Sequence, residues 1–519
     1  MRRRTFLTAT AAAGAAVIAL PVMNAYSPSW FRKSPPKPPT PDAAPSAFTN
    51  EPTWPTTETT TATITAAHNR YLCGGATISE AQKYFTEGWC PVIVDVSGPT
   101  TRAILLDNNG TWITKVVEHD SDDRENYYEK EASASDRTTI VLGPALLDDD
   151  HAYLVIGSFT EPEDTTSSSS PPRKENTSVV MLKIRLSDGA ITTSTTLSEN
   201  FPTGYSDDTY SNMYLSFTED RSALLLTGSD DIYGADHEYI GLRLSTDDLS
   251  TQFDAHSIIG NQPDTKITSY GQALGATYQS AKGETIVFLT NGTQETAEAE
   301  FSYIVRDGWY YYMDVSLSVE NRDNAARYYA RNLTSGQTIE LDDTWGSDTG
   351  NHVWPDIASD QQTIITTIGK DSTSTVKDSA NTVTAGLAVR PPGASVPALR
   401  WRRENKKVKR AGILGDTLYV TYSSTDSNRN ARLELMSVST GETISEADAK
   451  IAESTTTDSS GLDLTAVTPW GLASHRNGFY AATSWLDSTP GPAPSAPTPP
   501  TTPPSTTNST EPSPSTTET

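Results

Sequence analysis

Leu182-Lys183-Ile184-Arg185-Leu186-Ser187-Asp188-Gly189-Ala190-Ile191 is the stretch of sequence that decides the fold. Apolar and polar residues alternate up to Ser187, as in a strand with one buried face, and Gly189 allows the positive φ of a tight hairpin. The same pattern recurs at residues 330–339 and 435–444, and looser copies lie at residues 103–112, 241–253 and 387–401. The repeated hairpin predicts an all-β fold that is built from similar units.

A second kind of hairpin pairs a strand of small residues with a strongly apolar strand. Residues 145–156 and 214–226 are clear examples, and further copies centre on residues 285–288, 363–365, 417–420 and 479–481. The two kinds of hairpin mostly alternate along the chain, so that one of each makes a four-stranded antiparallel sheet. A series of such sheets is typical of a β-propeller.

The number of hairpins sets the expected number of blades. Six hairpins of the second kind, with an extra strand pair at residues 303–312, predict a single propeller of about seven four-stranded blades, with six or eight blades as the alternatives. We expect the last hairpin, residues 470–485, to pair with strands near residues 103–117, because that pairing closes the ring and leaves no free sheet edge. A tandem of β-sandwiches is the alternative, and the alternation of hairpins argues against it.

The strand-Ser/Thr-x-Gly-strand hairpins resemble the outer blade hairpins of the PQQ-like (quinoprotein-type) β-propeller superfamily. The resemblance covers most of residues 90 to 486, and it implies the fold. A quinoprotein would also need cation ligands and a stacking aromatic side chain in a central funnel, and none is identifiable in this sequence.

The N-terminus, Arg2-Arg3-Arg4-Thr5-Phe6-Leu7, resembles the twin-arginine export signal of bacteria, in which Arg3, Arg4, Phe6 and Leu7 would be the signal residues. The apolar run that follows ends near Leu20 and is shorter than the roughly 20 strongly apolar residues of a membrane span. We therefore expect an extracytoplasmic protein. An uncleaved N-terminal anchor is the alternative, because Met23 stands where a signal peptidase expects a small residue.

Composition then divides the chain into four parts. Residues 1–25 are the predicted signal segment, residues 26–65 a Pro/Thr-rich linker, residues 66–487 the propeller, and residues 488–519 a disordered Pro/Ser/Thr-rich tail. The net charge of −26 argues against a nucleic-acid partner and favours a soluble monomer. An even pair of cysteines in an exported chain predicts a disulfide between Cys73 and Cys90, with two buried free thiols as the alternative.

Three groups of residues are candidates for binding. Asp230, Asp231, Asp236 and Glu238 gather on one loop and make calcium a possible cofactor, although the spacing is not that of an EF-hand and a solvated acidic loop is the alternative. Arg400, Arg402, Arg403, Lys406 and Lys407 form a basic segment that suits an anionic envelope polymer, unless the segment is merely solvated or pairs internally. The aromatic residues 309–312 and 352–355 would suit a carbohydrate platform, but packing between blades is the favoured interpretation.

No nucleophile or zinc-protease motif of the Gly-x-Ser-x-Gly or His-Glu-x-x-His kind occurs in the sequence. We therefore expect a non-catalytic exported propeller that binds an extracytoplasmic ligand, envelope polymer or protein partner. The alternative is an exported propeller enzyme, either a quinone-dependent dehydrogenase or a glycan-active hydrolase.

Overall fold

The structure is a computed structural model that describes residues 38–40, 43–55, 62–78, 81, 85, 88–98, 100–106, 111–117, 138–160, 178–197, 213–218, 220–229, 239–255, 257, 266–269, 273–280, 283–290, 293–298, 301–306, 308–314, 327–341, 352–354, 363–369, 382–388, 398–403, 408–422, 433–447, 464–475 and 478–487. These residues belong to one compact unit, Pro38–Asp487. The predicted signal segment and the predicted tail lie outside the described residues.

The described strands form eight consecutive antiparallel sheets, numbered here 1 to 8 in chain order. Sheets 1 to 3 contain β1 (Ala62–His68), β2 (Tyr71–Thr77), β3 (Trp89–Asp95), β4 (Thr100–Leu106) and β5 (Trp112–Val116); β6 (Thr138–Leu147), β7 (His151–Thr160), β8 (Ser178–Arg185) and β9 (Ile191–Thr196); and β10 (Tyr214–Phe217), β11 (Ala223–Ser229), β12 (Tyr239–Ser245) and β13 (Thr251–Asp254). Sheets 4 and 5 contain β14 (Lys266–Ser269), β15 (Leu274–Ser280), β16 (Gly283–Thr290) and β17 (Thr293–Glu298); and β18 (Phe301–Arg306), β19 (Trp309–Asp314), β20 (Arg327–Asn332) and β21 (Thr338–Leu341). Sheets 6 to 8 contain β22 (His352–Trp354), β23 (Thr363–Gly369), β24 (Thr382–Ala388) and β25 (Ala398–Arg403); β26 (Val408–Leu414), β27 (Thr417–Tyr422), β28 (Leu433–Ser437) and β29 (Thr443–Ala447); and β30 (Leu464–Thr468), β31 (Gly471–Ser474) and β32 (Gly478–Ala481), which the short helix α4 (Thr483–Leu486) follows.

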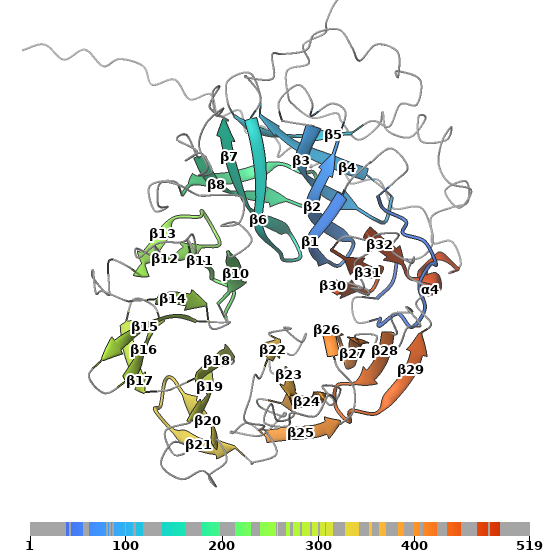
Figure 1. Ribbon diagram of the computed structural model, residues 1–519. Coiled ribbons are helices and arrows are strands. Elements are labelled where there is room, and N and C mark those ends of the chain that lie inside the picture. The colour runs from blue at the N-terminus through green and yellow to red at the C-terminus, as the bar shows by residue number, and fades with distance from the viewer. Residues whose placement is uncertain are drawn as a thin grey trace, which may run out of the picture. The chain divides into compact units, whose positions relative to one another are not determined.

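The sheets are the blades of a β-propeller. Successive sheets contact one another through β1 and β6, β6 and β10, β11 and β14, and β26 and β30, and β30 also contacts β1. Figure 1 shows the sheets arranged around a common centre, with first strands such as β10, β22 and β26 nearest to it. The prediction of an all-β propeller is therefore confirmed.

The favoured number of seven blades is wrong, because the described strands form eight sheets. In the described residues six sheets have four strands, whereas sheet 1 has five and sheet 8 has three. The expected pairing of residues 103–117 with the last hairpin is also wrong, because β4 pairs with β3 and β5 pairs with β4, which makes both part of sheet 1. A tight turn between neighbouring strands closes a shorter loop than a pairing of distant segments would.

A segment of the predicted linker takes the place of the missing fourth strand of sheet 8. Phe48 forms an antiparallel bridge with Ala482, and Trp54 forms one with Phe479, the second residue of β32. The compact unit accordingly begins at Pro38 rather than at residue 66, and its first and last sheets are joined by residues from both ends of the unit.

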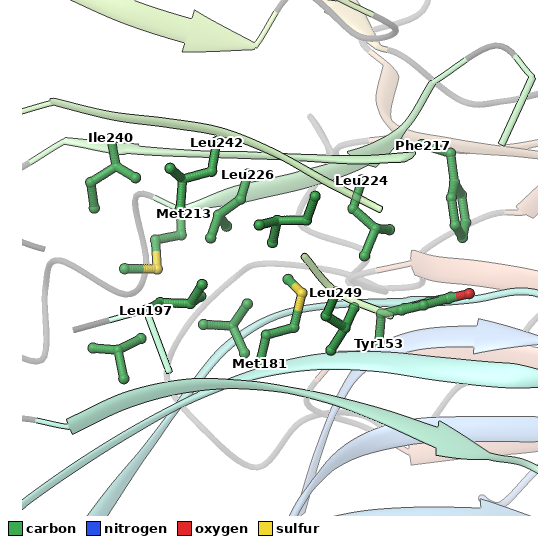
Figure 2. Close-up of a cluster of buried hydrophobic side chains, with 13 residues drawn as sticks. Tyr153, Met181, Leu197, Met213, Phe217, Leu224, Leu226, Ile240, Leu242 and Leu249 are labelled. Atoms are coloured by element: carbon green, nitrogen blue, oxygen red, sulfur yellow. The ribbon is translucent and has the colours of Figure 1, made fainter. Parts of the chain in front are cut away.

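Alternating apolar side chains build the core between neighbouring sheets. On β12, Ile240, Leu242 and Leu244 face sheet 2 and pack against residues such as Met181 (Figure 2). Burial of each such side chain contributes about 1.5–3 kcal/mol. The period-2 pattern that was visible in the sequence is therefore the pattern of contact between blades.

The repeated Gly hairpin has the geometry that the sequence predicts. Gly189, Gly336 and Gly441 have φ of 76°, 71° and 72°, and each donates its backbone N–H to the carbonyl of the residue four positions earlier. In sheet 3 the same place is held by Leu249, with φ 58° and the same N–H bond, here to Ser245. A left-handed conformation costs a leucine roughly 1–2 kcal/mol.

The meander gives the sheets two different ends. We call the turn end the one where the first strand of a sheet turns into the second and the third into the fourth, and the loop end the opposite one. Within a sheet, the longest connection at the turn end is residues 389–397. Longer ones, such as those from β7 to β8 and from β27 to β28, leave from the loop end.

Candidate functional site

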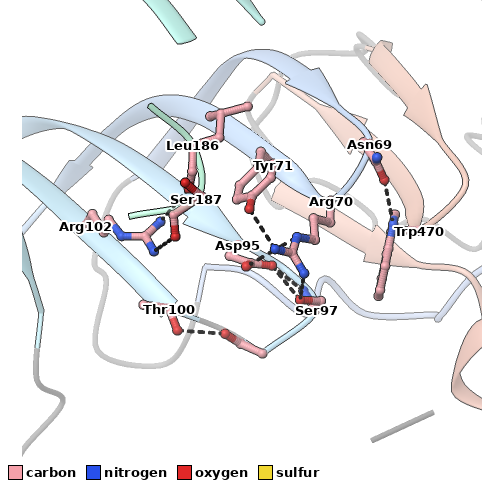
Figure 3. A network of polar contacts seen from close by, with 11 residues as sticks. Asn69, Arg70, Tyr71, Asp95, Ser97, Thr100, Arg102, Leu186, Ser187 and Trp470 are labelled. Atoms are coloured by element: carbon pink, nitrogen blue, oxygen red, sulfur yellow. Dashed lines mark hydrogen bonds and ion pairs between the residues drawn. The ribbon is translucent and has the colours of Figure 1, made fainter. Parts of the chain in front are cut away.

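A group of polar side chains gathers at the turn end of sheets 8, 1 and 2, and we call it the turn-end cluster (Figure 3). Arg70, in the turn between β1 and β2, places its Nε 3.5 Å from Oδ2 of Asp95 and donates a 2.8 Å hydrogen bond to the Tyr71 hydroxyl. Oδ1 of Asp95 accepts bonds of 3.0 and 2.6 Å from the backbone N–H and hydroxyl of Ser97. Burial alone would lower the pKa of Arg70, but the Asp95 charge and the Tyr71 bond outweigh it and raise that pKa.

Two members of the cluster connect sheet 1 to its neighbours. Trp470, in the β30–β31 turn, donates from Nε1 to Oδ1 of Asn69 over 2.9 Å, and Asn69 has the positive φ of 52° that asparagine tolerates. On the other side, Arg102 of β4 donates 3.3 Å bonds to the carbonyls of Leu186 and Ser187 in the hairpin of sheet 2.

The first turn of sheet 2 adds Asp148, Asp149 and His151, and Asp149 meets His68 at the end of β1. Nε2 of His68 lies 2.8 Å from Oδ1 of Asp149, whose side chain is 82% exposed. Asp148 accepts a 2.6 Å bond from the backbone N–H of His151 and a 3.1 Å bond from the hydroxyl of Tyr153. Burial and Lys183 lower the pKa of His151, while burial and Asp148 raise the pKa of Tyr153.

The bonds of the turn-end cluster are made within and between turns. Asp95 and Asp148 use their oxygens to hold the N–H groups of the turns that follow them, as aspartates at turns commonly do. Arg102 and Trp470 join one sheet to the next. These hydrogen bonds therefore stabilise the turns and hold neighbouring sheets of the propeller together. In the part of the chain that the structure describes, no group of three or more His, Cys, Asp or Glu side chains is placed to hold a metal ion.

The predicted disulfide between Cys73 and Cys90 is wrong. Cys73 and Cys90 are both buried free thiols. In the β2–β3 register Cys73 pairs with Ile93 and Cys90 pairs with Ala76, so the cysteines are three positions apart and point to opposite faces of the sheet. Three positions span roughly 10 Å along a strand, whereas a disulfide needs Cα atoms within about 7 Å. Burial raises the pKa of each thiol to about 12.

Of the other residues that were predicted to be functional, only three lie among the described residues. Arg400, Arg402 and Arg403 lie on β25, the last strand of sheet 6, and only the backbone is described there. The remaining candidates lie outside the described residues: the export residues Arg3, Arg4, Phe6 and Leu7, the basic residues Lys406 and Lys407, and the calcium candidates Asp230, Asp231, Asp236 and Glu238.

The aromatic run of β19 packs within its own sheet and, through Tyr310, in a buried cluster with Ala273, which precedes β15 of sheet 4. Trp309, Tyr310 and Tyr311 are buried. Tyr312 stacks on Tyr310 at 5.0 Å and on Tyr329 of β20 at 5.4 Å. Residues 352–354 form β22, and nothing in the described part of that strand tests a carbohydrate platform.

Sequence reasoning did not find the turn-end cluster. Its one local signal is a polar residue that directly follows an apolar strand, such as Asn69 after β1, Asp95 at the end of β3 or Asp148 after β6. Which of these residues meet depends on how the sheets stack, and no local pattern carries that information.

Fold and cluster together define a β-propeller whose turn end is braced by polar side chains. No family model matches the chain, and no curated protein matches it. Similar solved structures include an uncharacterized protein of Listeria monocytogenes EGD-e, at 9% identity and TM-score 0.33 over 60% of this chain and 82% of that one. The β-propeller domain of the Trilobed protease from Pyrococcus furiosus has 9% identity and TM-score 0.34 over 57% of this chain and 80% of that one.

The acylaminoacyl peptidase of Pyrococcus horikoshii, at 12% identity and TM-score 0.33, is matched over 59% of this chain but only 45% of its own. Similarities this low add no argument about activity, and the propeller assignment rests on the strand order and sheet contacts of this chain. No helix among the described residues has the length and apolarity to cross a bilayer.

Proposed function

We propose that this chain is a monomeric propeller exported through the signal in residues 1–25, and that it acts outside the cytoplasm as a non-catalytic binding protein for an anionic envelope polymer. The observation that carries the proposal is the position of the basic segment, residues 400–410. This segment holds seven Arg and Lys residues and one acidic residue in a chain of net charge −26.

The basic segment spans the passage from sheet 6 to sheet 7. β25 ends at Arg403 and β26 begins at Val408, so the segment crosses from the last strand of one sheet to the first strand of the next. In a meander with this connectivity, such a passage lies at the loop end. Clustered cations at a strand junction attract a polyanion by ion pairing at several points.

The turn end carries aspartates where the basic segment carries cations. Its short turns carry Asp148, Asp149 and Asp150 in sheet 2, and Asp247 and Asp248 in sheet 3. Exposed carboxylates repel a polyanion at separations below a Debye length, about 8 Å at physiological salt. The acidic residues Asp230 and Asp231, between β11 and β12, also belong to a loop-end connection. The proposal therefore rests on the local charge of the basic segment and not on the charge of the whole loop end.

Binding of purified teichoic acid to the full chain tests the proposal. We expect the triple variant R402E/K406E/K407E to bind at least about 10-fold more weakly than the wild type, with a smaller salt dependence. The control variant K115E/K183E/R221E, in which Lys115 is an exposed residue of β5, makes the same charge change at the turn end and should bind within about twofold of the wild type. Unchanged binding by the first variant, or an equal loss in the control, contradicts the proposal.

A further inference from the structure

Residues 43–55, which we call the strap, bind to sheet 8 through main-chain hydrogen bonds. The backbone N–H of Thr49 donates to Ala481 over 2.9 Å, and that of Thr53 donates to Phe479 over 2.7 Å. Phe479 returns a 2.7 Å bond to the carbonyl of Trp54. The strap thus covers the free edge of sheet 8 through two isolated antiparallel bridges, and an extended peptide could supply the same N–H and carbonyl groups.

Side chains add specificity at the two ends of the strap. Trp54 is only 2% exposed. Phe48 lies edge-on to Tyr419 with ring centroids 6.4 Å apart, and the Tyr419 hydroxyl donates a 2.7 Å bond to the carbonyl of Pro45. The receiving surface, which we call the acceptor edge, consists of β32 with Ala482, Thr483 and Tyr419.

Gly478 makes the close approach of the strap feasible. It has φ 94°, and a Cβ at this position would lie 2.2 Å from the carbonyl oxygen of Trp54. The acceptor edge therefore has a shaped contact for the Trp-Pro end of the strap as well as a row of hydrogen-bonding groups.

We propose that the acceptor edge is a binding site for an extended peptide with phenylalanine at one end and Trp-Pro six residues later. In the intact chain the strap occupies it, because the short connection to β1 gives the strap an effective concentration in the millimolar range. Once the chain is cut between Pro55 and Ala62, the strap becomes an ordinary ligand that exchanges with free peptide or with the strap of a second cut copy. This inference is independent of polymer binding.

The experiment uses the full chain with a specific protease site in place of residues 56–61. After cutting, we expect the N-terminal fragment to co-elute with the propeller in gel filtration. Excess labelled peptide of residues 43–55 should then replace the fragment at one per chain. A peptide with Trp54→Ala should bind at least about 100-fold more weakly, because truncation of a buried tryptophan removes most of its contact energy.

The uncut form of the same variant controls for the inserted site, and Gly478→Ala in the cut protein should release the fragment. The proposal is overturned if the fragment separates and no peptide binds, if it stays bound but never exchanges, or if the Trp54→Ala peptide binds as well as the unchanged one.

Discussion

Leu249 occupies the position at which three equivalent hairpins have glycine. Whether alanine or glycine is the more stable replacement there therefore depends on the backbone conformation. The residue has φ 58° and is fully buried in the core between sheets 2 and 3 (Figure 2). We consider two replacements, Leu249→Ala and Leu249→Gly. Both remove the buried side chain, but only glycine removes the Cβ that disfavours the left-handed conformation.

The expected magnitudes follow from these two contributions. Leu249→Ala should lower the free energy of unfolding by about 3–4 kcal/mol, since truncation of a buried leucine typically costs about 2–5 kcal/mol. Leu249→Gly should regain about 1 kcal/mol of this loss through relief of the positive φ. Gly336→Ala isolates the backbone contribution, because its φ is 71° and a Cβ there would meet no atom within 4 Å. It should cost about 1 kcal/mol.

Urea unfolding followed by tryptophan fluorescence measures all three variants. The expected order of stability is wild type, Gly336→Ala, Leu249→Gly and then Leu249→Ala. The reasoning is refuted if Leu249→Ala is at least as stable as Leu249→Gly, because alanine would then fit the backbone. It is equally refuted if Leu249→Gly matches the wild type, because the side chain would then contribute nothing.

Two further predictions concern ionisable groups. A hydrogen bond from Arg185 and one from the backbone of Ala190 lower the pKa of Asp188 below 3.8, so its contribution to stability is present above that pH and is lost as the pH falls through the lowered value. Asp188→Asn should therefore lower the urea midpoint at pH 7, with the difference becoming smaller as the pH falls; a difference that does not shrink with falling pH contradicts this. Cys73 and Cys90 should resist a thiol reagent at pH 8 in the native protein and react in urea, since burial raises their pKa to about 12. Rapid native labelling, or a change in thermal stability on reduction, would show the reasoning to be wrong.

The strands were predictable because their signals are local. Gly189, Gly336 and Gly441 mark hairpins through a backbone requirement that only neighbouring residues influence, and the structure has the expected positive φ at all three. Alternating residues such as Leu182 and Ile184 likewise report a buried face directly.

The blade number and the disulfide were not predictable, because both depend on register. Whether two cysteines share a face depends on whether an odd or even number of positions separates them in the β2–β3 pairing, and the spacing from Cys73 to Cys90 does not reveal this. Counting hairpins also cannot show that β5 extends sheet 1 instead of completing sheet 8. The turn-end cluster was missed for the same reason, since Asn69 and Trp470 meet only when the first and last sheets stack.

The strap shows why a segment that was predicted to be a linker can still pair with the edge of a sheet. Its prolines Pro45, Pro52 and Pro55 lower the local strand signal, because proline cannot donate to a ladder and is excluded from central strands. On the outermost strand of a sheet the same property is favourable, since only one side pairs and the other faces solvent. A proline there removes an N–H that could otherwise recruit another chain. The prolines that weaken the strand signal of the strap therefore suit it to the outer edge of sheet 8. There Phe48 and Trp54 supply the contacts that alternating apolar residues provide in a regular strand.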